Sequence, residues 1–66
     1  MEEINLIADD KNMRIDAWIA GEIKNLSRNY IQKLIDDGNI VVNNAKVKSN
    51  YRLKPGDNIV LNIPEP

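Results

Sequence analysis

Neither cysteine nor histidine occurs in this chain of 66 residues. A chain this short buries only about 60% of its unfolded surface, and many domains of this size depend on disulfides or a structural metal. Here disulfides, Cys/His zinc sites, thiol nucleophiles and histidine general bases are all excluded. The chain must therefore fold around one small apolar core, and we expect neither a metal nor a cofactor.

The composition is that of an ordinary globular chain, with 42% hydrophobic and 29% charged residues. This is too apolar for a disordered segment. No apolar run approaches the roughly 18–20 residues of a membrane span, and no signal peptide opens the chain. Since a domain without disulfides is also compatible with a reducing compartment, we expect a soluble cytoplasmic protein.

The charges are segregated along the chain, although the net charge is only −1. Residues 1–22 carry six acids and two bases, residues 23–54 carry seven bases and two acids, and residues 55–66 carry two acids. A protein meets nucleic acid with one face, so the local field matters more than the total charge. The basic middle favours an anionic partner, but a solvated charged surface explains it equally well.

A first helix is predicted over residues 14–23, because apolar side chains recur there every four residues. They are Ile15, Ile19 and Ile23, with Trp18 beside them. Asn12 or Met13 is expected to cap this helix. Trp18 could stack on a nucleic-acid base, but its apolar neighbours favour a place in the core.

A second helix is predicted over residues 28–37, with Ser27 as its N-cap and Gly38 as the left-handed residue that ends it. At 100° per residue, its side chains divide into two arcs. The apolar arc, expected to face the core, contains Tyr30, Ile31, Leu34 and Ile35. The opposite arc carries hydrogen-bond donors: Arg28, Asn29, Gln32 and Lys33.

Strands are predicted over residues 2–8, 40–42, 46–48 and 58–63, from β-branched or alternating apolar residues. Asn43-Asn44 suits a tight turn with positive φ at both positions, and Pro55-Gly56 predicts a type II turn. The predicted fold class is α+β, with two helices packed on a small, mostly antiparallel sheet. Pro64-Glu65-Pro66 reads as a linker, which gives one domain over residues 1–63 and a linker over 64–66 to a domain absent from this chain.

An ordered set of short motifs resembles the S4 domain, named for ribosomal small-subunit protein four. The motifs are Arg14-Ile15-Asp16, Ser27-Arg28-Asn29, Leu34-Ile35-Asp36-Asp37-Gly38, Ile40-Val41-Val42-Asn43-Asn44 and Leu53-Lys54-Pro55-Gly56-Asp57. The resemblance covers roughly residues 13–63 and implies an RNA-binding module. The strand ahead of Arg14 and the ending after Asn62 resemble pseudouridine synthases of the large-subunit ribosomal RNA type, in which this domain precedes the catalytic one.

The resemblance and the helical arcs together imply one RNA-binding surface made of three groups. They are the start and outer arc of the second helix (Ser27, Arg28, Asn29, Gln32, Lys33), then Arg14, then the Asn43-Asn44 turn with Lys46 and Lys48. Arginine and lysine suit phosphate oxygens, and amides suit 2′-hydroxyls and base edges. We expect these groups to form one continuous positive patch, open to solvent and free of ion pairs with Asp16, Asp36 and Asp37.

Asp16 has two possible roles. Arg14-Ile15-Asp16 is superficially similar to the catalytic Arg-Leu-Asp motif of pseudouridine synthases, but no Thr-Ser-Gly follows it and it opens an amphipathic helix. Asp16 is therefore expected to pair with a nearby arginine or to support the helix start. No second acid–base group accompanies it, so we expect no enzyme activity from this chain itself.

The sequence therefore predicts a monomeric module that docks structured RNA, ribosomal RNA first of all, and positions a pseudouridine synthase catalytic domain. No membrane and no small-molecule substrate are expected. Two alternatives stay open. The module could belong to another RNA-handling protein, of the heat-shock or tRNA-synthetase type. It could also be a protein-interaction module that binds no RNA, as the acidic ends and the net charge of −1 suggest.

Overall fold

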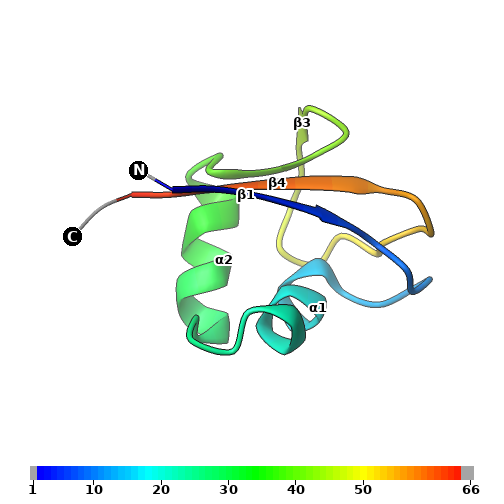
Figure 1. The fold of residues 1–66 in the computed structure, drawn as a ribbon, viewed down its shortest axis with the longest axis horizontal. Coiled ribbons are helices and arrows are strands. Elements are labelled where there is room, and N and C mark those ends of the chain that lie inside the picture. Colours follow the sequence, from blue (N-terminus) through cyan, green and yellow to red (C-terminus); the bar gives the residue numbers. More distant parts are fainter. Residues whose placement is uncertain (1, 65–66) are drawn as a thin grey trace.

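The protein is seen in a computed structural model that describes residues 2–64. These residues form two layers, with both helices on one side of a sheet (Figure 1). The elements are, in order, β1 (Glu2–Ile7), α1 (Ile15–Glu22), α2 (Arg28–Asp36), β2 (Ile40–Val42), β3 (Ala45–Lys46) and β4 (Asn58–Ile63). The predicted α+β architecture is confirmed.

The sheet has the strand order β1-β4-β2-β3, and all its pairs are antiparallel. One of the two inner strands is β4, which pairs with β1 from Glu2↔Ile63 to Ile7↔Asn58. On its other side β4 pairs with β2, with Leu61 opposite Ile40. The first and last strands of the described chain are thus neighbours, and β1 and β3 form the two edges of the sheet.

The core lies between the helices and the inner face of the sheet. Its buried apolar side chains are Ala8, Ile15, Trp18, Ile19, Ile31, Leu34, Ile35, Ile40, Val42, Leu53, Ile59 and Leu61. Both predicted helical stripes are confirmed, including the placement of Trp18, which is only 4% exposed and donates its indole N–H to Asp9 Oδ1 at 3.3 Å. Tyr30 and Tyr51 are half-buried and pack against this core.

The predicted turn residues have the backbone conformations that their types favour. Asn43 and Asn44 have φ values of 51° and 65°, so the hairpin between β2 and β3 is the expected tight turn. Gly38 ends α2 with φ 81°, and Gly56 completes the turn before β4 with φ 91°. These four positions fix where the chain reverses direction.

Two local predictions are wrong. The third strand is shorter than the predicted 46–48, because pairing stops at Val41↔Lys46 and Val47 packs against the core instead. The residue at the N-cap of α1 is Arg14, with extended backbone (φ −62°, ψ 137°) and no side-chain cap. Asn12 adopts a left-handed turn, and backbone pairing between Arg14 and Arg52 fixes the helix start.

The predicted linker is only partly visible, since residues 65 and 66 lie outside the described residues, as does residue 1. Among residues 2–64, neither helix has the length and apolar character needed to cross a membrane.

Candidate functional site

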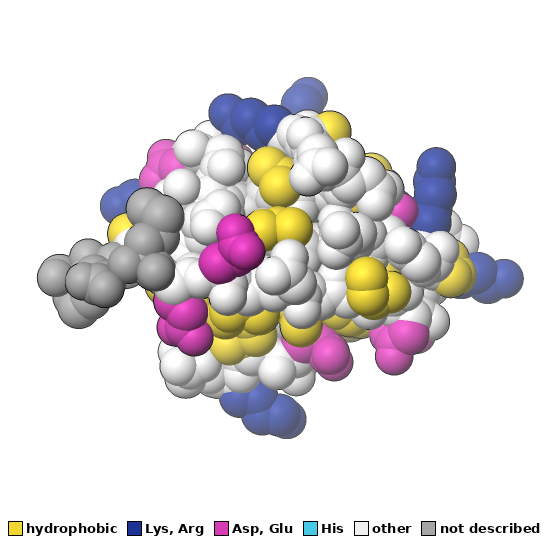
Figure 2. Space-filling view, turned by 45° about the horizontal axis from the view of Figure 1, so that its top comes forward, with side chains coloured by type: hydrophobic (Ala, Val, Ile, Leu, Met, Phe, Trp, Pro, Cys, Tyr) yellow, Lys and Arg dark blue, Asp and Glu magenta, His cyan; other side chains and the backbone are white. Residues whose placement is uncertain are grey.

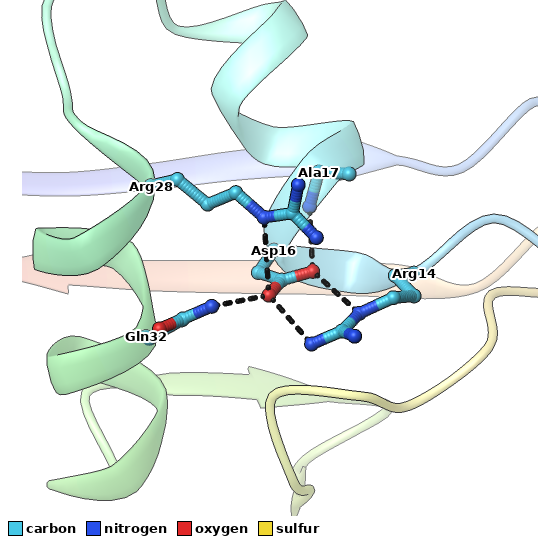
Figure 3. A network of polar contacts seen from close by, with 5 residues as sticks. All are labelled: Arg14, Asp16, Ala17, Arg28 and Gln32. Carbon is cyan, nitrogen blue, oxygen red and sulfur yellow. Dashed lines mark hydrogen bonds and ion pairs between the residues drawn. The ribbon is translucent and has the colours of Figure 1, made fainter.

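The most densely bonded polar group of the site is the carboxylate of Asp16, in the first turn of α1 (Figure 3). Its Oδ1 accepts hydrogen bonds from Arg14 Nε at 3.2 Å and from the Ala17 amide at 2.8 Å. Its Oδ2 accepts hydrogen bonds from Arg14 Nη2 at 3.0 Å and Gln32 Nε2 at 2.8 Å, and lies 3.4 Å from Arg28 Nε. The start of α1 and the first turns of α2 therefore meet at one carboxylate.

This carboxylate stays ionised although it is fully buried. Burial by itself raises the pKa of Asp16, but the hydrogen bonds from Gln32, Arg14, the Ala17 amide and Arg28 outweigh it and hold the pKa below the ordinary value of 3.8. One buried negative charge thus lies between two guanidinium groups. The cluster keeps a positive excess of one charge.

Both arginines keep part of their surface open to solvent. The side chains of Arg14 and Arg28 are 38% and 50% exposed, whereas Asp16 is 0% exposed. Asp16 engages the Nε/Nη2 edge of Arg14 and the Nε of Arg28. A guanidinium has five N–H donors, so donors on the outer edge of each group remain for an acceptor from outside.

The outer arc of α2 extends this cluster along the helix. Asn29 and Lys33 are exposed, and Gln32 is half-buried against Asp16. The predicted N-cap is confirmed, since Ser27 Oγ accepts the Tyr30 amide at 3.1 Å. At 100° per residue, Asp36 also falls on this arc, between the directions of its donors. The last turn of the arc is therefore less positive than the first.

Lys46 and Lys48 lie at the far end of α2. Together with Val47 and Asp36 they line an open hollow of about 420 Å³. Asp36 is the last residue of α2, whereas Arg28 is the first. The two lysines thus lie beside the last residue of α2, whereas Arg28 is at its first residue.

The hairpin turn belongs to a second network, centred on Asp57. Asn43 donates from Nδ2 to Asp57 Oδ1 at 3.1 Å, and its Oδ1 accepts the Asn58 amide at 3.0 Å. Asp57 Oδ2 also accepts the Lys54 amide at 3.0 Å and the Tyr51 hydroxyl at 2.9 Å. Both asparagines are exposed, but both polar atoms of the Asn43 side chain are used in hydrogen bonds within the fold.

The Asp57 network also shifts two pKa values. The Lys54 amide is the largest cause that lowers the pKa of Asp57 below 3.8; burial opposes it, and the bonds from Tyr51 and Asn43 assist it. The bond to Asp57 is the largest cause that raises the pKa of the Tyr51 hydroxyl above 10.0. Asp57 is only 7% exposed, and its carboxylate accepts three hydrogen bonds from within the fold. We therefore interpret this network as structural.

The structure therefore only partly agrees with the expected surface. It brings Arg14, Arg28 and Gln32 together, places Lys46 and Lys48 at the other end of α2, and holds the Asn43 side chain in the Asp57 network. The expectation that the cations avoid ion pairs is wrong for Arg14 and Arg28, because both lie against Asp16. The expectation that Asp16 pairs with an arginine is confirmed.

Figure 2 views the molecule tilted toward the helix-free side of the sheet. Figure 2 shows Lys and Arg side chains around the rim of that view, with acidic and apolar side chains between them. The donors near α2 are therefore not matched by a comparable cluster on this face. Among residues 2–64, no group of three or more acidic side chains could hold a metal ion.

Sequence reasoning identified Asp16 as a partner of an arginine but missed the network around Asp57 and the bond from Gln32 to Asp16. Asp57 follows the Lys54-Pro55-Gly56 turn, and its carboxylate accepts the amide of Lys54, three residues earlier. That local pattern was a usable signal. In contrast, the bond from Asn43 to Asp57 joins residues 14 positions apart, and the bond from Gln32 to Asp16 joins residues 16 positions apart. Such long-range bonds have no signature in one sequence.

Two helices packed on a four-stranded antiparallel sheet, with arginine and amide donors gathered where the helices begin, define a small binding module of the S4 type. The family model of the S4 domain matches residues 13–59. The chain therefore belongs to the S4 domain family, and the resemblance noted in the sequence is confirmed.

Similar proteins are named as RNA pseudouridine synthases. An uncharacterized RNA pseudouridine synthase, YlyB, of Bacillus subtilis (strain 168) is 38% identical over 68 residues, covering 100% of this chain and 22% of that protein. One from Chlorobaculum parvum is 43% identical over 54 residues, covering 82% of this chain and 16% of that protein. The ribosomal large subunit pseudouridine synthase C of Buchnera aphidicola subsp. Schizaphis graminum is 38% identical over 48 residues, covering 73% of this chain and 15% of that protein.

The chain thus spans about a fifth of the length of curated relatives that it matches. No solved structure matches it. Family membership supports an RNA-binding module, and the relatives are named as pseudouridine synthases.

Proposed function

We propose that this chain docks structured RNA, ribosomal RNA first of all, and positions the catalytic domain of a pseudouridine synthase. The S4 family match and the names of the relatives support this proposal. The chain itself is proposed to catalyse nothing: the oxygens of Asp16 are saturated by donors, so this carboxylate is not available as a nucleophile. We also propose that it acts as a cytoplasmic monomer.

The observation that carries the proposal is the pair of half-exposed guanidinium groups held by one buried carboxylate. Arg14 immediately precedes α1 and Arg28 opens α2, yet both side chains lie against Asp16 while 38% and 50% of their surface stays exposed. Guanidinium groups bind phosphate oxygens through two parallel hydrogen bonds. Oriented guanidiniums of this kind suit the backbone of a folded RNA.

The other predicted site residues are proposed to contribute in different ways: through contacts to phosphates, through contacts to sugars or bases, or indirectly through the fold. Lys33, Lys46 and Lys48 supply further contacts to phosphates, because their ammonium groups are point charges on flexible stems. Asn29, Gln32 and Asn44 supply amides for 2′-hydroxyls or base edges, and Ser27 sets the start of α2. Asn43 acts indirectly, by shaping the turn that presents Asn44.

Binding by so few cations is expected to be weak and sensitive to salt. For about three or four phosphate contacts, the slope of log K against log salt is about −3. In a longer protein, attachment to a catalytic domain turns such a weak contact into a useful local concentration. The relatives, of which this chain covers about a fifth, are long enough to contain such a domain.

A salt series of binding to fragments of large-subunit ribosomal RNA tests the proposal. The critical comparison is Lys33→Glu against Lys11→Glu, because both lysines are exposed and the two variants have the same change in charge. Only Lys33 lies on the α2 arc; Lys11 lies in the turn before α1. Lys33→Glu should weaken binding about tenfold and reduce the salt slope by about 1, while Lys11→Glu changes little.

Arg28→Glu gives a second, stronger perturbation, because it also places a carboxylate beside Asp16. Its fold must be checked by circular dichroism before binding is measured. Equal binding by the wild-type chain and by the Lys33 and Arg28 variants would count against the RNA-binding surface and for the protein-interaction alternative. Absence of any salt-dependent RNA binding by the wild-type chain would overturn the proposal outright.

A further inference from the structure

We propose that Asp16 is a positioning residue for RNA binding: its buried carboxylate holds the two guanidinium groups so that their outer edges face one phosphate-binding surface. This inference rests on the proposed function and deepens it. It runs against simple charge counting, because an acid at a surface that binds phosphate should weaken binding. The structure provides a reason why this acid does the opposite.

The first reason is that the carboxylate is hidden from the surface that it organises. Asp16 is 0% exposed, and both of its oxygens accept hydrogen bonds from within the fold. An arriving phosphate therefore meets guanidinium groups and not the carboxylate. Because the acid faces inward and the arginines are 38% and 50% exposed, attraction dominates at the surface.

The second reason is that two cations are held close together. Arg14 Nη2 lies 3.0 Å and Arg28 Nε lies 3.4 Å from the same oxygen of Asp16, which bounds their separation at about 6.4 Å. Two guanidinium groups at this separation repel each other unless an anion lies between them. Without the carboxylate, the two long side chains would move apart and sample many rotamers.

The third reason concerns which donors are left for a ligand. Asp16 takes the Nε/Nη2 edge of Arg14 and the Nε of Arg28, so each guanidinium plane is fixed through its inner edge. The N–H donors of both groups that do not contact Asp16 remain for a phosphate. An RNA phosphate that meets a pre-oriented donor pair loses less side-chain freedom on binding, which raises the affinity.

Asp16→Asn tests the inference against a matched control, Asp36→Asn. Each variant removes one negative charge near α2, but Asp36 is exposed and lines the hollow with Lys46 and Lys48. With a hairpin of large-subunit ribosomal RNA as the probe, Asp16→Asn should bind about tenfold more weakly although it is more positive. Asp36→Asn should bind equally or more tightly. Equal or tighter binding by Asp16→Asn overturns the inference.

A merely structural role for Asp16, which also joins α1 to α2 through Gln32, gives a different result. Binding is therefore corrected for the folded fraction, and the salt slope is measured for each variant. Positioning predicts a shallower slope for Asp16→Asn and a smaller effect of Arg28→Ala in that background than in the wild type. If Asp16→Asn leaves the salt slope unchanged, and its effect on affinity adds to that of Arg28→Ala, the positioning role of Asp16 is overturned.

A charge-conserving variant keeps the inference testable if Asp16→Asn fails to fold. Arg28→Lys keeps the positive charge but cannot place Nε against Asp16 with the outer donors still free. It should bind the RNA hairpin several-fold more weakly, and binding equal to that of the wild type overturns the inference. The two possible failures are distinguishable. If the wild-type chain does not bind the RNA hairpin, the proposed function fails. If the wild-type chain binds and Asp16→Asn binds equally tightly, only the inference about Asp16 fails.

Discussion

Asp57→Asn should remove a large part of the stability of this fold. The Asp57 carboxylate accepts three hydrogen bonds, from the Lys54 amide at 3.0 Å, the Tyr51 hydroxyl at 2.9 Å and Asn43 Nδ2 at 3.1 Å. It thereby joins the hairpin turn, the loop before β4 and the turn at Gly56. No other side chain among the described residues joins these three segments by hydrogen bonds.

The size of the effect follows from the bonds that an asparagine can keep. An amide oxygen in place of Oδ2 still accepts from Lys54 and Tyr51, but more weakly, because the charge is gone. The amide nitrogen then faces the donor of Asn43, whose own oxygen already accepts the Asn58 amide. With about 1.5–3 kcal/mol for a hydrogen bond to a charged group, the expected loss is about 2–3 kcal/mol.

That loss is about half of the roughly 3–5 kcal/mol expected for a domain of this size. It corresponds to a melting temperature lowered by about 10–20 °C. Thermal unfolding followed by far-UV circular dichroism at pH 7 measures it. Asp36→Asn is the control, since Asp36 is exposed and its replacement should leave the melting temperature within about 3 °C of the wild type.

The pH dependence gives the same experiment a second readout. The folded-state pKa of Asp57 is lowered, so its contribution is fully present above the ordinary value of 3.8 and is lost as the pH falls through the folded-state value. Asp57→Asn should therefore differ most from the wild type above pH 5, and the difference should shrink below pH 3.8. A variant that melts with the wild type at pH 7 would refute the structural role of this network.

Two further predictions concern the helix start and the missing histidine. Ser27→Ala should lower the free energy of unfolding by about 1 kcal/mol in urea denaturation, because the Tyr30 amide loses its cap; no loss would contradict the cap. RNA affinity should be constant between pH 5.5 and 7.5, because the chain has no histidine and the pKa of Asp16 lies below 3.8; a titration in this range would contradict the proposed contacts.

The fold was predictable from the sequence because its determinants are local. The apolar stripes of α1 and α2, the serine cap, and the left-handed Asn43, Asn44, Gly38 and Gly56 each act within a few residues. Where a long-range contact decides the local structure, the prediction fails. Backbone pairing with Arg52 sets the start of α1, and packing of Val47 ends β3 early.

The candidate site was predictable as a set of residues and not as an arrangement. Helical periodicity placed Arg28, Asn29, Gln32 and Lys33 on an outward arc, but only the packing of α1 against α2 brings Gln32 and Arg28 to Asp16. Similarly, asparagine at position 43 predicted the turn conformation. Only the structure reveals that the side-chain amide of Asn43 is already bonded to Asp57 and to the Asn58 amide. One sequence specifies local geometry, whereas shared partners arise from tertiary packing.

The central claim is that RNA meets the surface at the start and outer arc of α2. The most direct test is an NMR titration of the ¹⁵N-labelled chain with a hairpin of large-subunit ribosomal RNA, observing backbone amides and arginine Nε–H groups. The account predicts the largest shift changes at Arg14, Arg28, Asn29 and Lys33, and smaller ones at Lys46 and Lys48. Changes concentrated on the outward residues of β1, such as Glu3, Asn5 and Ile7, would contradict it.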